Sequence, residues 1–521
     1  MTDTFRGGTL TLYSFRAIFG AMALALAACS SDSEIAAHKA AEAAAMLDAG
    51  NMYGARLAAQ DSIKARDDIS ANWILLGRIQ LATGQIGDAY VSYTRALELD
   101  ATNVEAMQLV AEIALQVGRF PDADKMADKV LALQPNAIRA KLIKGFVALG
   151  NGKLDDATKF ADDILATSPN DDGGVVLKAR ALAKMGQLGP ATELLQKQMI
   201  LSKGEIVPST LAEVQRAAGD GAGLADTLRS IVADKPTDDR VFDLASVLYK
   251  IGKPEDARAV LFKRLDERKD SADYYDEATK FLIAADPAAI DPAHVTQIAS
   301  NGTPLMRELA ARVLLASGRA PEARQVLQPI SGSTDNPDLQ ALYATTLTQT
   351  GSAAQAPAIV ARVLAKDDTN VDALQLRAQM RQASGDEKGA MADAALVALN
   401  SPLSITGRMV TINAYLRRDD KRRARQLFEE AVRLMPKNLD MTTRYAQFLI
   451  SEGDFGRATE IMLNYTSLNP SRLKGWDVFR SMCRDAACMA GTARGRLAAG
   501  KLFPADEFAG KKPTPGLFGP L

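Results

Sequence analysis

Small residues recur along the chain in two columns that keep one register. The first column begins at Ala43, and the second follows it by twelve residues, beginning at Ala55; both return every 33 or 34 residues. Glycines form a third column between them, seven residues after the first and five before the second: Gly50, Gly84, Gly118, Gly152, Gly186, Gly219, Gly252, Gly318, Gly351, Gly385 and Gly453. A period of this length predicts a solenoid built from one repeated supersecondary unit.

The spacing of the columns predicts that each unit is a helical hairpin. Two antiparallel helices approach closely only where the side chains that face each other are small. A glycine at the end of the first helix is able to adopt the left-handed conformation that closes a helix. Prolines mark the junctions between units, where a preceding helix cannot continue: Pro135, Pro169, Pro236, Pro402, Pro436 and Pro470. We therefore expect an all-α chain.

The unit from Ser70 to Asn103 carries the columns most completely. Its characteristic residues are Trp73, Leu76, Gly77, Gly84, Ala89, Tyr93 and Ala96. In these residues the unit resembles the tetratricopeptide repeat. The resemblance implies a right-handed superhelical solenoid of about thirteen hairpins. These units begin near residues 36, 70, 104, 138, 172, 205, 238, 271, 304, 337, 371, 405 and 439.

Two units depart from the pattern. In residues 271–303 Ala285 replaces the turn glycine, and prolines at 287 and 292 interrupt the second helix, so we interpret this degenerate unit as a bend between residues 36–270 (units 1–7) and 304–472 (units 9–13). In the unit that begins at 405, Asp419 stands in the glycine column and Ile412 in the first small column.

The N-terminus has the layout of a secretory signal. Arg6 and Arg16 precede a short apolar run, which is too short to span a membrane. The run ends in Leu26, Ala27, Ala28 and Cys29, which resembles a bacterial lipobox. The resemblance implies a signal peptide over 1–28, a lipidated Cys29 and a short polar tether over 29–35, with the chain held on the periplasmic face of the outer membrane. A plain signal peptide that happens to end near a cysteine is the alternative.

The end of the chain does not repeat the columns. Residues 473–500 contain Trp476 at helical spacing with other apolar residues and predict a capping helix. Cys483 and Cys488 lie in this segment. Export favours a disulfide between them, which requires a turn because residues five apart on an unbroken helix lie too far from each other. Free thiols, or a redox or metal role, are the alternatives.

Residues 501–521 form a proline-rich segment, which predicts an extended tail. One interpretation is a disordered end. The other is a peptide that docks on a partner or in the superhelix through Phe508, Leu517 and Phe518.

Composition and motifs exclude several classes of function. The formal net charge is −1, which gives no field that would gather nucleic acid. The two histidines, His38 and His294, lie far apart in the sequence and in no metal-ligand spacing. The sequence contains neither a glycine-rich phosphate loop nor a nucleophile elbow. We therefore expect no enzyme activity, no cofactor and no metal site.

Binding is expected on the inner surface, which in tetratricopeptide repeats is lined mainly by the first helix of each hairpin. The candidate groove residues are Arg78, Glu112, Arg180, Arg312, Gln375, Gln379, Asn413 and Gln447. Amide side chains hydrogen-bond a peptide backbone or sugar hydroxyls equally well, so protein and glycan partners both remain open. A candidate basic patch consists of Arg417, Arg418, Lys421, Arg422, Arg423 and Arg425, and its alternative is an ordinary solvated helix end.

The lipobox and the repeats together are similar to the tetratricopeptide-repeat lipoproteins of bacterial exopolysaccharide export and exosortase systems. The similarity implies a non-enzymatic scaffold for protein partners in the envelope, in exopolysaccharide secretion or envelope assembly. A periplasmic chaperone or assembly factor for outer-membrane or cell-wall proteins is one alternative. A direct glycan-binding protein is another.

Overall fold

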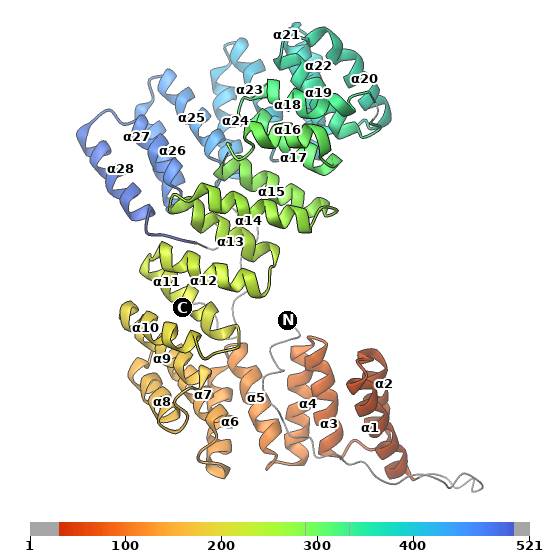
Figure 1. Cartoon of the computed structure of the whole chain (residues 1–521), viewed down its shortest axis with the longest axis vertical. Coiled ribbons are helices and arrows are strands. Elements are labelled where there is room, and N and C mark those ends of the chain that lie inside the picture. Colours follow the sequence, from red (N-terminus) through yellow and green to blue (C-terminus); the bar gives the residue numbers. More distant parts are fainter. Residues whose placement is uncertain (1–30, 287, 333, 505–521) are drawn as a thin grey trace, which may run out of the picture. The chain divides into compact units, whose positions relative to one another are not determined.

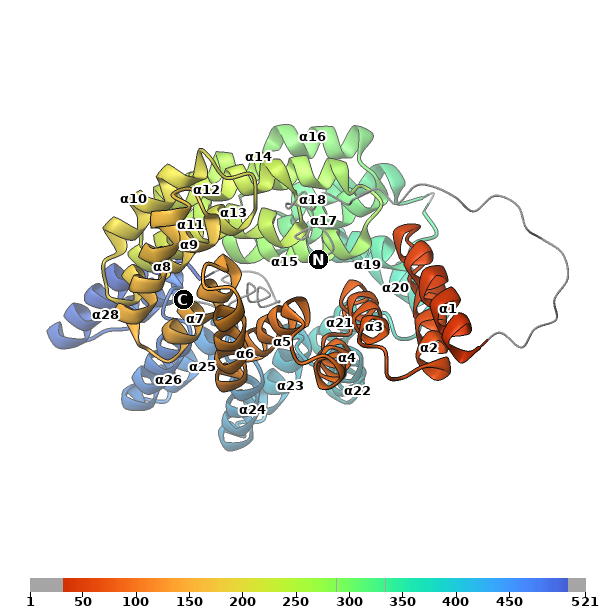
Figure 2. The same cartoon turned by 90° about the horizontal axis from the view of Figure 1, so that it is seen from below.

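The computed structural model describes residues 31–504 except 287 and 333, and every regular element in that range is helical. The chain forms two compact units that divide between Ala218 and Gly219. Figures 1 and 2 show each unit as a series of short helices that follow one another in pairs. These pairs are helical hairpins stacked into an all-α solenoid.

The first unit contains α1 (Asp32–Asp48), α2 (Met52–Ala65), α3 (Ser70–Ala82), α4 (Ile86–Leu99), α5 (Val104–Gln116), α6 (Phe120–Leu133), α7 (Ile138–Gly150), α8 (Leu154–Thr167), α9 (Asp172–Lys184), α10 (Leu188–Met199) and α11 (Ile206–Ala218). The second unit contains α12 (Gly221–Asp234), α13 (Asp238–Lys250), α14 (Pro254–Glu267), α15 (Ala272–Ala285), α16 (Pro292–Asn301), α17 (Pro304–Ala316), α18 (Ala320–Leu327), α19 (Pro337–Gln349), α20 (Ala356–Lys366), α21 (Val371–Ala383), α22 (Glu387–Asn400), α23 (Ile405–Arg417), α24 (Lys421–Leu434), α25 (Leu439–Ser451), α26 (Phe455–Leu468), α27 (Leu473–Ser481) and α28 (Ala486–Ala499). Short 3₁₀ turns occupy 328–330 and 353–355.

The glycine column closes the first helix of each hairpin as its spacing predicts. All eleven glycines of the column have positive φ; Gly118, for example, has a φ of 75° after the end of α5. Asp419 occupies the same place after α23 with a φ of 56°. Left-handed backbone is nearly free of cost for glycine and costs more for a residue with a Cβ. The turn geometry is therefore kept at Asp419, whereas Ala285, which replaces the glycine in the degenerate unit, is the last residue of the helix α15.

The two small columns lie at the crossing of the helices in each hairpin. Ala43 and Ala55, which begin the columns, are fully buried. Gly77 of α3 contacts the ring of Tyr93 on α4, because a Cβ built on this glycine would lie 2.8 Å from Tyr93 Cζ. Tyr93 is itself fully buried. The missing side chain of one helix thus makes the space for a buried aromatic ring of its partner.

Odd-numbered and even-numbered helices form two layers. In most repeats an odd-numbered helix packs against its own hairpin partner and also against the next odd-numbered helix. Figure 2 shows the layers at α13–α16, where α14 and α16 lie outside α13 and α15. The odd-numbered helices therefore form the inner layer of each unit, and the even-numbered helices form the outer one.

The degenerate unit at 271–303 differs from the others in its packing. Its first helix, α15, is regular and packs mainly against α17, whereas its short second helix, α16, packs against α17 and α18. Asp291 caps α16 by accepting a hydrogen bond from the backbone N–H of His294. The proline at 292 therefore begins this helix instead of interrupting it, which corrects the prediction for this position.

Two predicted boundaries differ from the structure. The polar tether predicted over 29–35 is already helical from Asp32, because Ser31 and Glu34 form a capping box that begins α1. The single capping helix predicted over 473–500 is a pair, α27 and α28, that packs as a further hairpin. The first of these boundaries is thus set by a local capping box and the second by a turn between two helices, and the repeat period sets neither of them.

The C-terminal end of the described chain lies against the first helices of the second unit. Phe503 is buried, with 6% of its surface exposed. A Cβ built on Gly221, the first residue of α12, would lie 2.5 Å from Phe503 Cζ and 2.6 Å from Ile251 Cγ2. Residues 501–503, which we call the C-terminal strap, therefore fill a site that the glycine leaves open at the start of α12.

Candidate functional site

Charged side chains on the inner layer of the first unit pair with one another. Arg78 on α3 forms an ion pair with Glu105 at the start of α5. Glu112 on α5 forms an ion pair with Arg139 on α7 at 2.8 Å. Burial raises the pKa of Glu112, although the guanidinium of Arg139 opposes this effect. These candidate groove residues therefore connect successive inner helices, and their charges are balanced within the chain.

Arg180 on α9 continues this arrangement in a less exposed setting. Its guanidinium donates to Glu213 on α11 at 2.8 Å, and only 5% of Arg180 is exposed. Burial raises the pKa of Glu213, and Arg180 works in the opposite direction. The pair thus joins two inner helices where the side chains are poorly hydrated.

Arg312 makes a longer connection in the second unit. Its guanidinium on α17 donates to Glu308 at 3.0 Å and to Asp372 on α21 at 2.7 Å. Burial disfavours the charged form of Arg312, but the two carboxylates outweigh it and raise the guanidinium pKa above its ordinary value. The ion pair joins α17 to α21, and α19 lies between them in the series of inner helices. The ion pair of Arg312 therefore connects repeats that are not adjacent in the sequence.

The amide side chains of the inner layer make fewer contacts within the chain than the charged ones. Gln375 donates to the hydroxyl of Ser404 at 2.8 Å, across to the start of α23. Gln379 and Gln447 are exposed, and Asn413 is half-buried. These last three side chains come from α21, α23 and α25, which are successive inner helices. Of the predicted groove residues, they are the ones that the structure leaves available to a partner.

The candidate basic patch is largely neutralised by neighbouring hairpins. Arg418 donates to Glu387 at 3.0 Å, Arg425 donates to Asp454 at 2.8 Å, and Lys421 lies 3.2 Å from Glu452. Arg417 donates to a backbone carbonyl, and Arg423 donates to a glutamine side chain. Five of the six residues of the cluster therefore have a partner within the chain, and Arg422, the sixth, is exposed.

Cys483 and Cys488 are joined by a disulfide, with their Cα atoms 5.5 Å apart. The turn that such a bond requires is present, because α27 ends at Ser481 and α28 begins at Ala486. Asp485 caps α28 by accepting from the backbone N–H of Cys488 at 2.8 Å. The disulfide thus fixes the junction of the last two helices.

A groove that the sequence did not reveal lies in the outer layer between α24 and α26. It has a volume of about 390 Å³. Its lining is Glu429, Val432, Arg433, Pro436, Thr442, Tyr445, Arg457, Ile461, Asn464, Tyr465 and Leu468. We call it the outer groove. The repeat pattern marks buried small residues and gives no signal for such a surface. Leu468, at one end of the groove, is 55% exposed.

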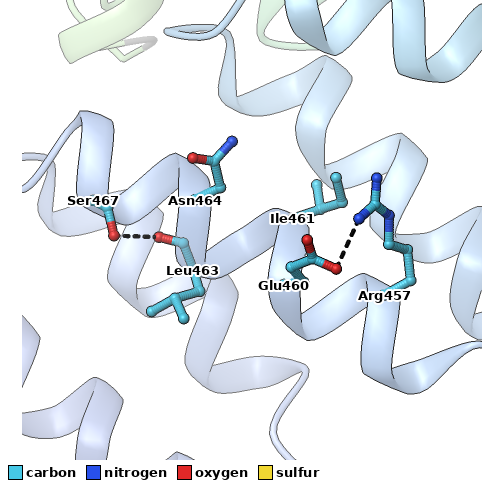
Figure 3. A pocket seen from close by; sticks show the side chains of 6 residues that line it. All are labelled: Arg457, Glu460, Ile461, Leu463, Asn464 and Ser467. Carbon is cyan, nitrogen blue, oxygen red and sulfur yellow. Dashed lines mark hydrogen bonds and ion pairs between the residues drawn. The ribbon is translucent and has the colours of Figure 1, made fainter.

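A second hollow of about 490 Å³ adjoins the same helix. Figure 3 shows the residues of α26 that line it, with the guanidinium of Arg457 turned toward the carboxylate of Glu460, 2.8 Å away. Arg457, Ile461 and Asn464 line both hollows. One face of α26 is therefore accessible along much of its length.

Some predicted sites lie outside the described residues. These are the lipobox residues Leu26, Ala27 and Ala28, the lipidation site Cys29, and the tail residues Phe508, Leu517 and Phe518. Within residues 31–504, apart from 287 and 333, no group of three or more His, Cys, Asp or Glu side chains is placed to hold a metal ion. None of the helices described in that range is long and apolar enough to cross a membrane.

Two segments of the chain, residues 73–145 and 314–380, match the family model of the tetratricopeptide repeat. No curated protein matches the chain significantly. Among solved structures, it is similar to a tetratricopeptide repeat protein from Parabacteroides merdae, with 13% identity and a TM-score of 0.36 over 60% of this chain and 99% of the other. It is also similar to PilW, a type IV pilus biogenesis factor, with 19% identity and a TM-score of 0.34 over 39% of this chain and 94% of the other. Yeast Tom70 is similar as well, with 13% identity and a TM-score of 0.30 over 89% of this chain and 96% of the other.

Proposed function

We propose that the chain is a non-enzymatic scaffold for protein–protein interactions, held by lipid on the periplasmic face of the outer membrane, in exopolysaccharide secretion or envelope assembly. Tetratricopeptide repeats generally mediate interactions between proteins. The observation that carries the proposal is the row of available amide side chains on successive inner helices, Gln379, Asn413 and Gln447.

A row of amides suits an extended polypeptide. Each amide group offers both a donor and an acceptor, which are the two groups that a peptide backbone presents. Successive inner helices present such amide groups along the solenoid. Stacked repeats therefore provide a long surface on which an extended polypeptide is able to bind. The charged inner residues support this assignment indirectly, because pairs such as Arg180 with Glu213 leave little net charge for an anionic polymer.

The location rests on the sequence. Leu26, Ala27 and Ala28 precede Cys29 in the lipobox arrangement, after a basic and apolar leader. More than one acyl chain on that cysteine would anchor the protein stably, whereas a single chain would not. The scaffold would then act at the membrane surface, where secretion and assembly machinery is found.

The proposal is tested by in-cell crosslinking, followed by recovery of the chain from membranes and identification of the proteins and glycans retained. Wild type is compared with Cys29→Ala, and with Ser30→Ala as a control that keeps the thiol. Recovery of polysaccharide synthesis or export proteins, lost in Cys29→Ala and kept in Ser30→Ala, supports a secretion scaffold. Recovery of assembly or cell-wall proteins instead supports envelope assembly, and retention of glycan without protein contradicts the scaffold.

A further inference from the structure

The outer groove has an apolar interior within a polar rim. Val432 of α24 and Ile461 of α26 are half-buried on its walls, and Tyr465 is buried beneath them. Leu468 extends the apolar surface and is 55% exposed. An accessible apolar groove between two helices has the form that accommodates a third helix, whose side chains enter the space between the existing ridges.

The carboxylate on the α24 wall already has partners on neighbouring helices. Glu429 accepts a hydrogen bond from the hydroxyl of Tyr445 at 3.0 Å, and the guanidinium of Arg457 lies 4.0 Å away. Burial, followed by this hydrogen bond, raises the pKa of Tyr445 to about 12, so the hydroxyl remains a donor at neutral pH. Both partners of Glu429 come from α25 and α26, so its carboxylate is not paired with an arginine of α24.

Two guanidinium groups on α24 have no such partner. Within the described parts of the chain, neither Arg422 nor Arg433 has an ion pair or a side-chain hydrogen bond, and both residues are exposed. They are eleven residues apart, which is about three turns, so they lie on one face of the helix roughly 16 Å from each other. Arg433 lines the outer groove, and Arg422 continues the same stripe.

We infer that the outer groove binds an acidic amphipathic helix of a partner protein, with apolar side chains on Val432, Ile461 and Leu468 and carboxylates on Arg422 and Arg433. This inference rests on the proposed function and names the class of partner that the scaffold takes at this site. The spacing of the arginines suits two carboxylates about three turns apart on the bound helix. The apolar contact supplies the affinity, and the charges select an acidic partner and set its register.

The test uses two designed helical peptides that share a leucine face and carry either glutamate or lysine on the other face. Each peptide is fused to a soluble fluorescent protein. Binding of the fusion to the full chain, immobilised in detergent, is measured by interferometry, and the signal from empty detergent micelles is subtracted. We expect the glutamate peptide to bind more tightly by about tenfold or more. Leu468→Asp, and Arg422→Glu combined with Arg433→Glu, should each weaken its binding by about tenfold.

Arg423→Glu is the matched control. It makes the same substitution at a single position of α24, so its charge change is half that of the double variant, and Arg423 points about 100° away from Arg422 and donates to Gln426. Equal binding of the two peptides, or equal losses in the control and the double variant, would overturn the inference. In the in-cell experiment, recovery of the same partners by the double variant overturns this site and leaves the scaffold standing, whereas absence of protein partners from wild type overturns both.

Discussion

The ammonium group of Lys250, the last residue of α13, donates a 2.9 Å hydrogen bond to the backbone carbonyl of Ser471, 221 residues further along the chain. The same ammonium lies 5.4 Å from the centre of the Phe503 ring. Phe503 and Ile251 both lie against Gly221. The first helices of the second unit are thus joined to its C-terminal part by Ser471 and by Phe503 of the C-terminal strap.

Replacing Phe503 tests whether the strap stabilises the start of the second unit. Phe503→Ala removes a buried ring, and we expect α12 and α13 to lose about 2 kcal/mol of protection, or roughly thirtyfold in amide exchange. Leu502→Ala is the control, because Leu502 is 42% exposed. Hydrogen–deuterium exchange of the full chain gives both values. Unchanged exchange in α12 and α13 would show that the strap contributes nothing to their stability.

Gly77 and Gly87 are expected to respond in opposite directions to the same substitution. A Cβ at Gly77 would meet the ring of Tyr93 at 2.8 Å, so Gly77→Ala should lower stability by about 1–3 kcal/mol despite the gain in helix propensity. A Cβ at Gly87 would meet nothing within 4 Å, so Gly87→Ala should raise stability by up to about 1 kcal/mol. Chemical denaturation followed by circular dichroism measures both, and equal effects would contradict the packing account.

Asp419 holds a left-handed conformation with a φ of 56° in a turn where eleven other repeats have glycine. We expect Asp419→Gly to raise stability by about 0.5 kcal/mol and Asp419→Ala to lower it by about 1 kcal/mol, because alanine keeps the Cβ and loses the polar side chain that tolerates this backbone. The predicted order of melting temperatures is Gly, Asp, Ala. An alanine variant that melts above wild type would refute this explanation.

The Arg180–Glu213 pair predicts a pH-dependent difference between wild type and Glu213→Gln. Since burial raises the folded-state pKa of Glu213, the folded chain binds this proton more tightly than the unfolded chain. The group therefore costs stability at pH values above its folded pKa, and this cost disappears as pH falls through that pKa. Glutamine does not titrate. The melting temperature of Glu213→Gln relative to wild type should rise from pH 4 to pH 7, and a difference that falls over this range would contradict the shift.

The repeat columns predicted most of the inner helices closely. The first helices of units 2 to 5 begin at Ser70, Val104, Ile138 and Asp172, where the columns place them. The prediction succeeds because two backbone constraints each favour a particular residue type. The left-handed turn favours glycine, and the close crossing of two helices favours small residues, so both are visible in the sequence. The start of α1 was missed because a local capping box set it, with no contribution from the period.

The candidate site was less predictable, because its availability depends on pairing between repeats. Arg78 with Glu105 and Glu112 with Arg139 are both 27 residues apart, which is one repeat less two helical turns. That spacing is a signal for ion pairs between successive inner helices. The outer groove has no comparable signal, since Val432 and Ile461 come from separate hairpins and become neighbours only through packing.

The most direct test of the scaffold is to compare proteins crosslinked in cells to the wild-type chain and to the combined variant Gln379→Ala, Asn413→Ala and Gln447→Ala. These side chains are exposed or half-buried, so the variant should melt like wild type. We predict that wild type recovers a defined set of envelope proteins and that the variant loses at least one of them. Recovery of no protein above background by the wild-type chain would contradict the account.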